Sequence, residues 1–168
     1  DDSLKYAAID SGTVFTSSRF GNSIYAIDVA NGTIKWTYTT VPGEIIKGQT
    51  VHTDRKRVFV GTTNGVGIFS LDQDTGDELW HHDSVESWVR SAVIAGRSLV
   101  FGTDHVIGAV GRSLGDLYWE DPVAAPVVDL SESDGGIYAA LGDGTVIHYN
   151  RANGTKVWST TLDQSLRS

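Results

Sequence analysis

The chain has 168 residues, a formal net charge of −8 and no cysteine. The absence of cysteine excludes disulfides, iron–sulfur clusters, thiolate zinc sites and cysteine nucleophiles. The acidic balance argues against nucleic acid as a partner, since phosphate binding needs a dense basic face, and no apolar run is long enough to span a membrane as a helix.

Short runs rich in Val, Ile, Tyr, Phe and Thr alternate with Gly, Asn and Asp along the chain, a pattern typical of strands joined by tight turns. No stretch shows sustained helical spacing of apolar residues. In chain order, strands are predicted at about 4–9, 13–18, 23–29 and 33–39, then 46–53, 57–62, 66–72 and 78–83, then 88–95, 97–102, 106–111 and 116–120, and finally 123–130, 136–141, 145–150 and 155–161. The sequence therefore predicts an all-β protein.

Four tryptophans recur at spacings of 44, 39 and 39 residues, and a glycine stands four residues before each. The pairs are Gly32 and Trp36, Gly76 and Trp80, Gly115 and Trp119, and Gly154 and Trp158. A period near 40 residues, with room for four strands in each repeat, is typical of the blades of a β-propeller. We therefore expect a single propeller domain over 1–168, with blades at about 4–39, 46–83, 88–120 and 123–161.

The repeated segments are AIDVANGTIKW at 26–36, SLDQDTGDELW at 70–80, AVGRSLGDLYW at 109–119 and HYNRANGTKVW at 148–158. They resemble the pyrroloquinoline-quinone repeat of quinoprotein-type β-propellers, whose pattern is Ala-x-Asp-x-x-Thr-Gly-x-x-x-Trp. The first segment keeps Ala26 and Asp28, whereas the third departs most, with Gly111 in place of the aspartate. The resemblance covers nearly the whole chain. The family that it indicates also includes propellers similar to the lipoprotein of outer-membrane assembly.

The eight repeated glycines and tryptophans are predicted to dock the blades rather than to bind a ligand. Each glycine lets the turn between the third and fourth strands reverse and leaves one peptide face uncovered. The tryptophan four residues on can cover that face while it reaches the neighbouring blade. Each ring can bury about 150–250 Å², so the rings would join the blades around the rim.

Trp88 breaks the repeat spacing and marks a candidate binding surface. In propellers, the loops between blades and the turns between second and third strands share one face, next to the mouth of the axial channel. The predicted binding residues on that face are Trp88, Arg90, Lys47, Arg19, Phe20 and His105, with Glu44, Asn64, Asp104 and Asp143 beside them. Aromatic and arginine side chains favour binding hot spots. The alternative, that Trp88 packs in the core of its strand, stays open.

Two further patterns have competing interpretations. The acidic segment 72–78 has the carboxylate density of a calcium loop, but Gly76 falls at the wrong position and the repeat itself accounts for the same residues. Asn31 and Asn153 each begin an Asn-Gly-Thr glycosylation acceptor. Asn-Gly is also a favoured hairpin turn, and whether these sites are glycosylated stays open.

The resemblance implies a non-enzymatic binding or scaffolding module with a protein partner. It also implies a place outside the cytoplasm, whether periplasmic, cell-surface or secreted. No catalytic residue, cofactor or metal site is predicted. The resemblance to quinoprotein dehydrogenases implies a quinone and a metal near the axis, but the vicinal cysteine pair of those enzymes cannot exist in this sequence. A fragment of such a dehydrogenase and a glycan- or ligand-sensing propeller remain the alternatives.

The blade count leads to a prediction about assembly. The resemblance implies seven or eight blades, so four blades would form either half of an eight-bladed ring or a small closed ring. A half-ring would leave two apolar faces in water. Two half-rings related by a two-fold axis would cover both faces, and residues 162–168 could latch the partner as an edge strand. We therefore expect a homodimer.

Overall fold

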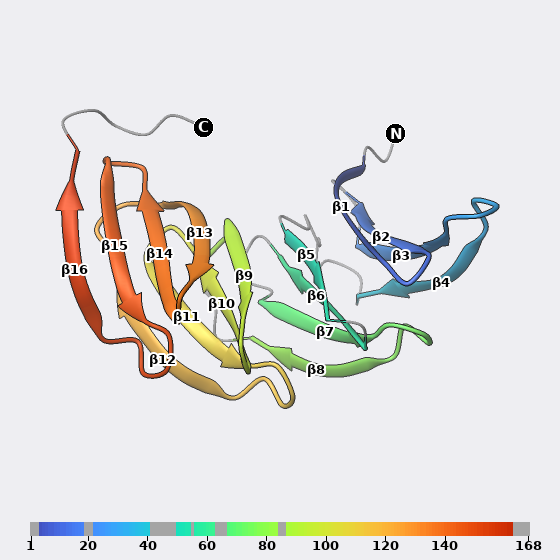
Figure 1. Cartoon of the computed structure of the whole chain (residues 1–168). Helices are drawn as coiled ribbons and strands as arrows, with labels where there is room; N and C mark the ends of the chain where they lie inside the picture. Colours follow the sequence, from blue (N-terminus) through green and yellow to red (C-terminus); the bar gives the residue numbers. More distant parts are fainter. Residues whose placement is uncertain are drawn as a thin grey trace. The chain divides into compact units, whose positions relative to one another are not determined.

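The computed structural model of the chain describes residues 4–18, 22–40, 50–54, 56–62, 67–83 and 87–162. Regular structure in these ranges consists of sixteen strands in four antiparallel sheets (Figure 1). The described residues include no helix long and apolar enough to cross a membrane. The prediction of an all-β protein with four four-stranded blades is confirmed.

Each sheet is a meander in which consecutive strands are neighbours. Blade 1 contains β1 (Leu4–Asp10), β2 (Thr13–Ser18), β3 (Ser23–Asp28) and β4 (Ile34–Thr39), and blade 2 contains β5 (Thr50–Thr53), β6 (Arg57–Gly61), β7 (Ile68–Asp72) and β8 (Glu78–His82). Blade 3 contains β9 (Ser91–Ala95), β10 (Ser98–Gly102), β11 (Val106–Gly111) and β12 (Leu117–Pro122), and blade 4 contains β13 (Val127–Ser133), β14 (Gly136–Leu141), β15 (Thr145–Asn150) and β16 (Lys156–Thr161).

The largest difference from the predicted strands is at β13, which runs from Val127 to Ser133 instead of 123–130. Pro126 precedes the strand and has no N–H to donate to a ladder. At the other end, Asp134 and Gly135 both have positive φ, 48° and 78°. Two consecutive residues of this kind form the tight turn favoured in β-hairpins, so the polar residues before Asp134 continue the strand.

The chain divides into two compact units, residues 1–88 and 89–168. The first unit has its own core, in which Phe15, Ala26 and Trp36 of blade 1 pack with apolar side chains of blade 2 such as Val58 and Leu71. Each of these side chains is at most 9% exposed. The predicted single-domain organisation stays a prediction.

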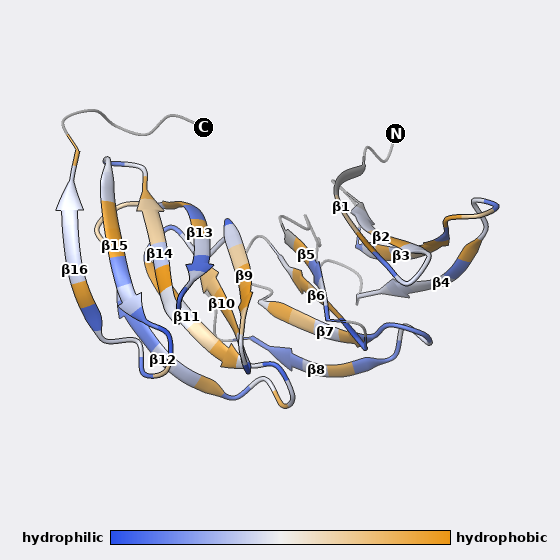
Figure 2. Cartoon of the chain, in the orientation of Figure 1, coloured by the Kyte–Doolittle hydropathy of each residue, from blue (hydrophilic) through white to orange (hydrophobic). Residues whose placement is uncertain are grey.

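The second unit has a separate core between blades 3 and 4. Val100, Ile107 and Ala109 of blade 3 pack with Ile137 and Tyr149 of blade 4, and all five are fully buried. The inner strands β10 and β14 carry the hydrophobic colours of Figure 2, whereas the edge strand β16 is mostly neutral. Every residue of β16 is exposed.

Cross-strand register shows which residues of a blade face its neighbour. In blade 1, Phe15 pairs with Ala26, and Ala26 with Trp36. Directly paired residues share one face of a sheet, and this row belongs to the core shared with blade 2. In blade 3, Val100, Ala109 and Trp119 form the corresponding row, which packs toward blade 4.

Candidate functional site

The turn between the third and fourth strands has the same hydrogen bonds in every blade. In blade 1, the Asp28 N–H donates to the Thr33 carbonyl over 2.8 Å, and the Gly32 N–H donates to the Asp28 carbonyl over 2.9 Å. Gly32 has φ +74°, a conformation that glycine adopts without steric cost. The corresponding glycines Gly76, Gly115 and Gly154 have φ between +68° and +79°.

The aspartate of the repeat caps this turn, a role that the sequence analysis missed. The Asp28 Oδ1 accepts the Ala30 N–H over 2.8 Å, and the Asp72 Oδ1 accepts the N–H groups of Asp74 and Thr75 over 2.9 and 3.0 Å. The bond from the Thr75 N–H is the largest cause holding the pKa of Asp72 below its usual value. Asp72 is therefore a turn-capping carboxylate.

The two asparagines of the acceptor sequences also hold their own turns. The Asn31 Oδ1 accepts the backbone N–H and the hydroxyl of Thr33 over 2.9 and 2.7 Å. The Asn153 Oδ1 makes the same two bonds with Thr155, over 3.1 and 2.8 Å. Side-chain bonds of this kind stabilise turns, which favours the hairpin interpretation of both sequences.

Each blade joint inside a unit consists of a tryptophan ring on a glycine of the next blade. A Cβ atom added to Gly76 would lie 2.7 Å from Cδ2 of Trp36, and one added to Gly154 would overlap the Trp119 ring. The Trp36 indole N–H donates to the Gln73 carbonyl over 3.0 Å. We predicted that each ring covers the glycine of its own turn. The structure shows a different arrangement, because nothing lies within 4 Å of a Cβ placed on Gly32, the glycine in the turn before Trp36.

The other predicted docking residues have different surroundings. Trp80 is 8% exposed, and its ring centroid lies 5.9 Å from that of Phe59. Gly115 lies in the blade 3 turn with φ +76°. Trp158 on β16 is 44% exposed. The exposed Trp158 ring and the open space over Gly32 mark the outer faces of blades 4 and 1.

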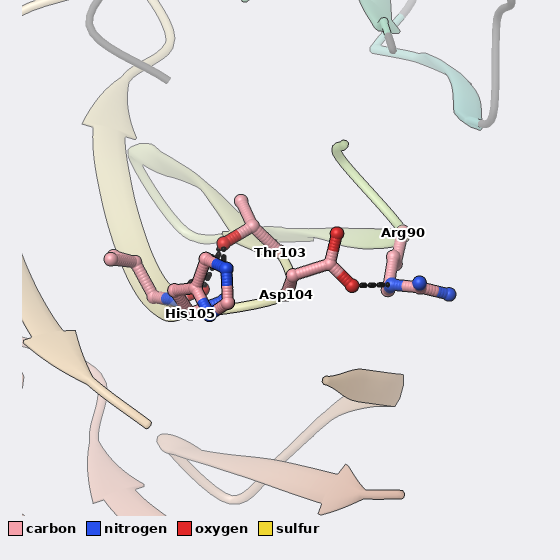
Figure 3. A network of polar contacts seen from close by, with 5 residues as sticks. Arg90, Thr103, Asp104 and His105 are labelled. Carbon is pink, nitrogen blue, oxygen red and sulfur yellow. Dashed lines mark hydrogen bonds and ion pairs between the residues drawn. The ribbon is translucent and has the colours of Figure 1, made fainter. Parts of the chain in front are cut away.

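A polar cluster of blade 3, the rim cluster, comprises Arg90, Thr103, Asp104 and His105 (Figure 3). The Arg90 Nε donates to Asp104 Oδ1 over 2.5 Å, and the Arg90 N–H donates to the Gly102 carbonyl over 2.8 Å. The Thr103 hydroxyl oxygen accepts the N–H groups of His105 and Val106 over 3.1 and 2.9 Å. These bonds fix the turn, while the side chains of Arg90 and Asp104 stay 38% and 23% exposed.

Backbone bonds also tie the rim cluster to the next blade. The Val123 N–H donates to the His105 carbonyl over 2.8 Å, and the Val127 N–H donates to the Thr103 carbonyl over 2.9 Å. The His105 side chain is exposed. A rigid turn that presents an arginine, an aspartate and a histidine to solvent can position hydrogen bonds for a polar surface of a partner.

Some of the other predicted binding residues are described by the structure, and the rest lie outside the described ranges. Trp88 precedes β9 and is 39% exposed, whereas Val89 is fully buried. Asp143 lies in the turn before β15, where the Thr145 N–H bonds its carboxylate and lowers its pKa. Arg19, Phe20, Glu44, Lys47 and Asn64 lie outside the described residues.

Tyr149 forms a polar link between blades 3 and 4 that the sequence analysis did not identify. Its ring is fully buried, and its hydroxyl donates to Asp121 Oδ2 over 2.7 Å. Lys156 lies 3.2 Å from the same oxygen. Burial is the largest cause that raises the pKa of Tyr149, and the bond to Asp121 adds to it. Ile27, Leu71 and Val110 occupy this position in the other repeats. A tyrosine at a position that is otherwise aliphatic was therefore the feature of the sequence that could have indicated this link.

A quinone enzyme of this fold needs a donor set for its quinone and metal. Within the described ranges, no three His, Asp or Glu side chains are arranged to hold a metal ion. The carboxylates of the acidic turn in blade 2 have local partners: the Thr75 hydroxyl, for example, donates to Asp77 Oδ2 over 2.8 Å.

Comparisons with known proteins identify relatives of the chain. A sequence model of the family described as outer membrane protein assembly factor BamB matches residues 3–132. No curated protein sequence matches.

Solved structures with low sequence identity share the fold. The computationally designed Ika8 protein has a TM-score of 0.84 at 17% identity, over 96% of this chain and 50% of that chain. BamB from Moraxella catarrhalis has a TM-score of 0.76 at 20% identity, over 96% of this chain and 52% of that one. Quinohemoprotein alcohol dehydrogenase from Comamonas testosteroni has a TM-score of 0.80 at 14% identity, over 95% and 35% of the two chains. The chain thus spans about half the length of the first two proteins.

Proposed function

This chain belongs to the family of the outer membrane protein assembly factor BamB, and from that membership we propose that it is a non-enzymatic propeller module that binds a protein partner outside the cytoplasm. The observation that carries the proposal is the family match, which spans blades 1 to 3 and the rim cluster. Such a module would work in the periplasm, at the cell surface or as a secreted protein.

The rim cluster is the proposed contact surface. Its turn is held by backbone bonds and by the Thr103 hydroxyl, so little ordering entropy is lost when a partner binds. Arg90 offers a planar group with several donors, which suits carboxylates and carbonyl oxygens of a protein surface. Trp88, which belongs to the first compact unit and is 39% exposed, is proposed as a separate contact, since aromatic side chains often dominate binding energy.

Site-specific photo-crosslinking in a host cell tests this proposal. A photoreactive residue at Trp88 or His105 should capture one defined protein, and the same residue at the exposed turn position Leu114 should not. With that protein purified, Arg90→Ala and Trp88→Ala should each weaken binding by about 2 kcal/mol, roughly 30-fold. Leu114→Ala is the matched control, since Leu114 is 73% exposed and lies outside the rim cluster.

Three outcomes would overturn the binding proposal. Equal capture from Leu114 would show that the rim cluster is not the contact surface. Saturable binding of a glycan at the rim cluster, without a captured protein, would favour a glycan sensor. Alcohol oxidation that depends on added quinone and metal would favour a dehydrogenase fragment. The predicted homodimer belongs to the same proposal and concerns a different surface.

A further inference from the structure

The rim cluster is held from one side by the end of strand β12. β12 ends at Pro122, and Asp121 pairs with Ile107 near the start of β11. Val123, the residue that follows the strand, donates its N–H to the His105 carbonyl over 2.8 Å. The position of the end of β12 therefore decides whether this bond to the rim turn can form.

Tyr149 of blade 4 holds that end of β12 by two contacts. Its ring stacks on Trp119, and its hydroxyl donates to Asp121 Oδ2 over 2.7 Å. Tyr149 and Ile107 belong to the core between blades 3 and 4, and Val123 packs against that core. Because the tyrosine is fully buried and bonded at its hydroxyl, it provides a fixed point for β12 and for the residue that bonds the rim turn.

The rest of the network around Asp121 is closer to solvent. Lys156 lies 3.2 Å from the Oδ2 atom that accepts the tyrosine hydroxyl, but the Lys156 side chain is 43% exposed. Exposed ion pairs contribute little to stability, whereas a hydrogen bond shielded from water is stronger. The Tyr149 hydroxyl, rather than the Lys156 ammonium, is therefore the group expected to hold β12.

We propose that Tyr149 and Asp121 form a positioning pair for the rim cluster. Their bond holds the end of β12 against blade 4, and Val123 then holds the His105 carbonyl. The Thr103 hydroxyl oxygen accepts the N–H of the same histidine (Figure 3), so His105 is held at both of its backbone polar groups. This inference rests on the proposed function, because it assigns the pair a role in presenting the contact surface.

Amide hydrogen exchange, followed residue by residue by NMR, tests the pair without any partner. Tyr149→Phe removes the hydroxyl and keeps the ring. The exchange rates of the Val123 and His105 N–H groups should rise by about 10-fold, because a lost bond to a carboxylate lets the end of β12 open more often.

A matched control separates this local effect from a general loss of stability. Ile147 is buried in the same core and lies on the same strand as Tyr149. Ile147→Val removes one buried methylene group and destabilises the core, but it leaves the bond to Asp121 in place. It should therefore leave the exchange rates of Val123 and His105 unchanged.

Substitutions at Asp121 separate the hydroxyl bond from the ion pair. Asp121→Asn keeps a side-chain oxygen that can accept the Tyr149 hydroxyl and removes the charge that faces Lys156. It should keep the exchange rates of the rim amides near those of wild type, whereas Asp121→Ala should match Tyr149→Phe. If Tyr149→Phe loses its far-UV circular dichroism spectrum, the two Asp121 variants carry the comparison.

Binding of the protein captured at the rim cluster supplies a second measurement. A turn that is less ordered before binding loses more entropy when the partner binds, so Tyr149→Phe should raise the dissociation constant by about 5-fold. Ile147→Val should leave the constant unchanged.

Unchanged rim amides in Tyr149→Phe, or an equal rise in Ile147→Val, would overturn the inference. Exchange in Asp121→Asn as fast as in Asp121→Ala would overturn the role of the hydroxyl bond. Faster exchange in Tyr149→Phe with unchanged partner affinity would overturn the role of the pair in binding. Failure to capture any protein at the rim cluster would contradict only the proposed function, because the exchange measurements need no partner.

Discussion

The two blade joints described within the units use the same ring-on-glycine contact but stabilise it differently. In the first, the Trp36 indole N–H donates to the Gln73 carbonyl. In the second, the Trp119 indole nitrogen is buried and has no hydrogen-bond partner among the described residues. Trp119 instead stacks on Tyr149, with ring centroids 5.8 Å apart and planes at 22°. Apolar packing is thus common to both joints. The hydrogen bond of the tryptophan nitrogen, here called the polar anchor, is present in the first joint and not among the described residues of the second.

Removal of the ring should have the largest effect at both joints. Trp36→Ala should lower the free energy of unfolding by about 3–5 kcal/mol, because a large aromatic leaves a cavity that the surroundings refill only in part. Trp119→Ala should fall in the same range. Denaturant melts of the two variants measure this, and values within 1 kcal/mol of wild type would show that the rings do not hold the blades together.

Glycine substitutions separate the contact from the backbone conformation. Gly76→Ala and Gly154→Ala should each cost about 2–4 kcal/mol, since the new methyl group meets a tryptophan ring and overpacking adds to the strain of positive φ. Gly32→Ala is the matched control, with φ +74° and open space around the new Cβ, and should cost only about 1 kcal/mol. The assay uses a chain concentration at which the wild type is monomeric. Equal losses at all three sites would show that the rings contribute nothing to the requirement for glycine.

The repeat spacing was sufficient to predict the four blades, because each blade reuses the same local turn and strand pattern. The glycine that each ring covers was not predictable, since Trp36 and Gly76 are brought together by the packing of two sheets. The pair of Arg90 and Asp104 likewise depends on register, with Ser91 opposite Gly102. The Tyr149 link to Asp121 joins two blades, and no local pattern specifies its partner.

A smaller substitution tests the polar anchor alone. Trp36→Phe keeps an aromatic ring but removes the donor to the Gln73 carbonyl, and an unpaired buried acceptor costs about 1–3 kcal/mol beyond the lost ring volume. Trp119→Phe removes a nitrogen that has no partner in the described structure, so only the volume term applies. The difference between the two variants in urea melts should therefore be about 1 kcal/mol or more. A larger loss at Trp119 would show that its nitrogen is bonded in solution.

The smallest predicted effect concerns the turns between third and fourth strands. Their contributions to the free energy of unfolding should differ between the two units only at acidic pH. Blades 1 and 2 place Asp28 and Asp72 at the capping position, whereas blades 3 and 4 have Gly111 and Asn150 there. The pKa of Asp72 is lowered in the folded chain, chiefly by the Thr75 N–H.

This shift stabilises the fold above the ordinary carboxyl pKa of about 4, and the stabilisation disappears as the pH falls through the lowered value. Because Asp72 is near solvent, the contribution should be at most about 0.5 kcal/mol. Asp72→Asn should flatten the fall in unfolding free energy between about pH 5 and pH 2, while Asp116→Asn, an exposed control with the same charge change, should not. An unchanged acid profile in Asp72→Asn would contradict a capping role for the Asp72 carboxylate.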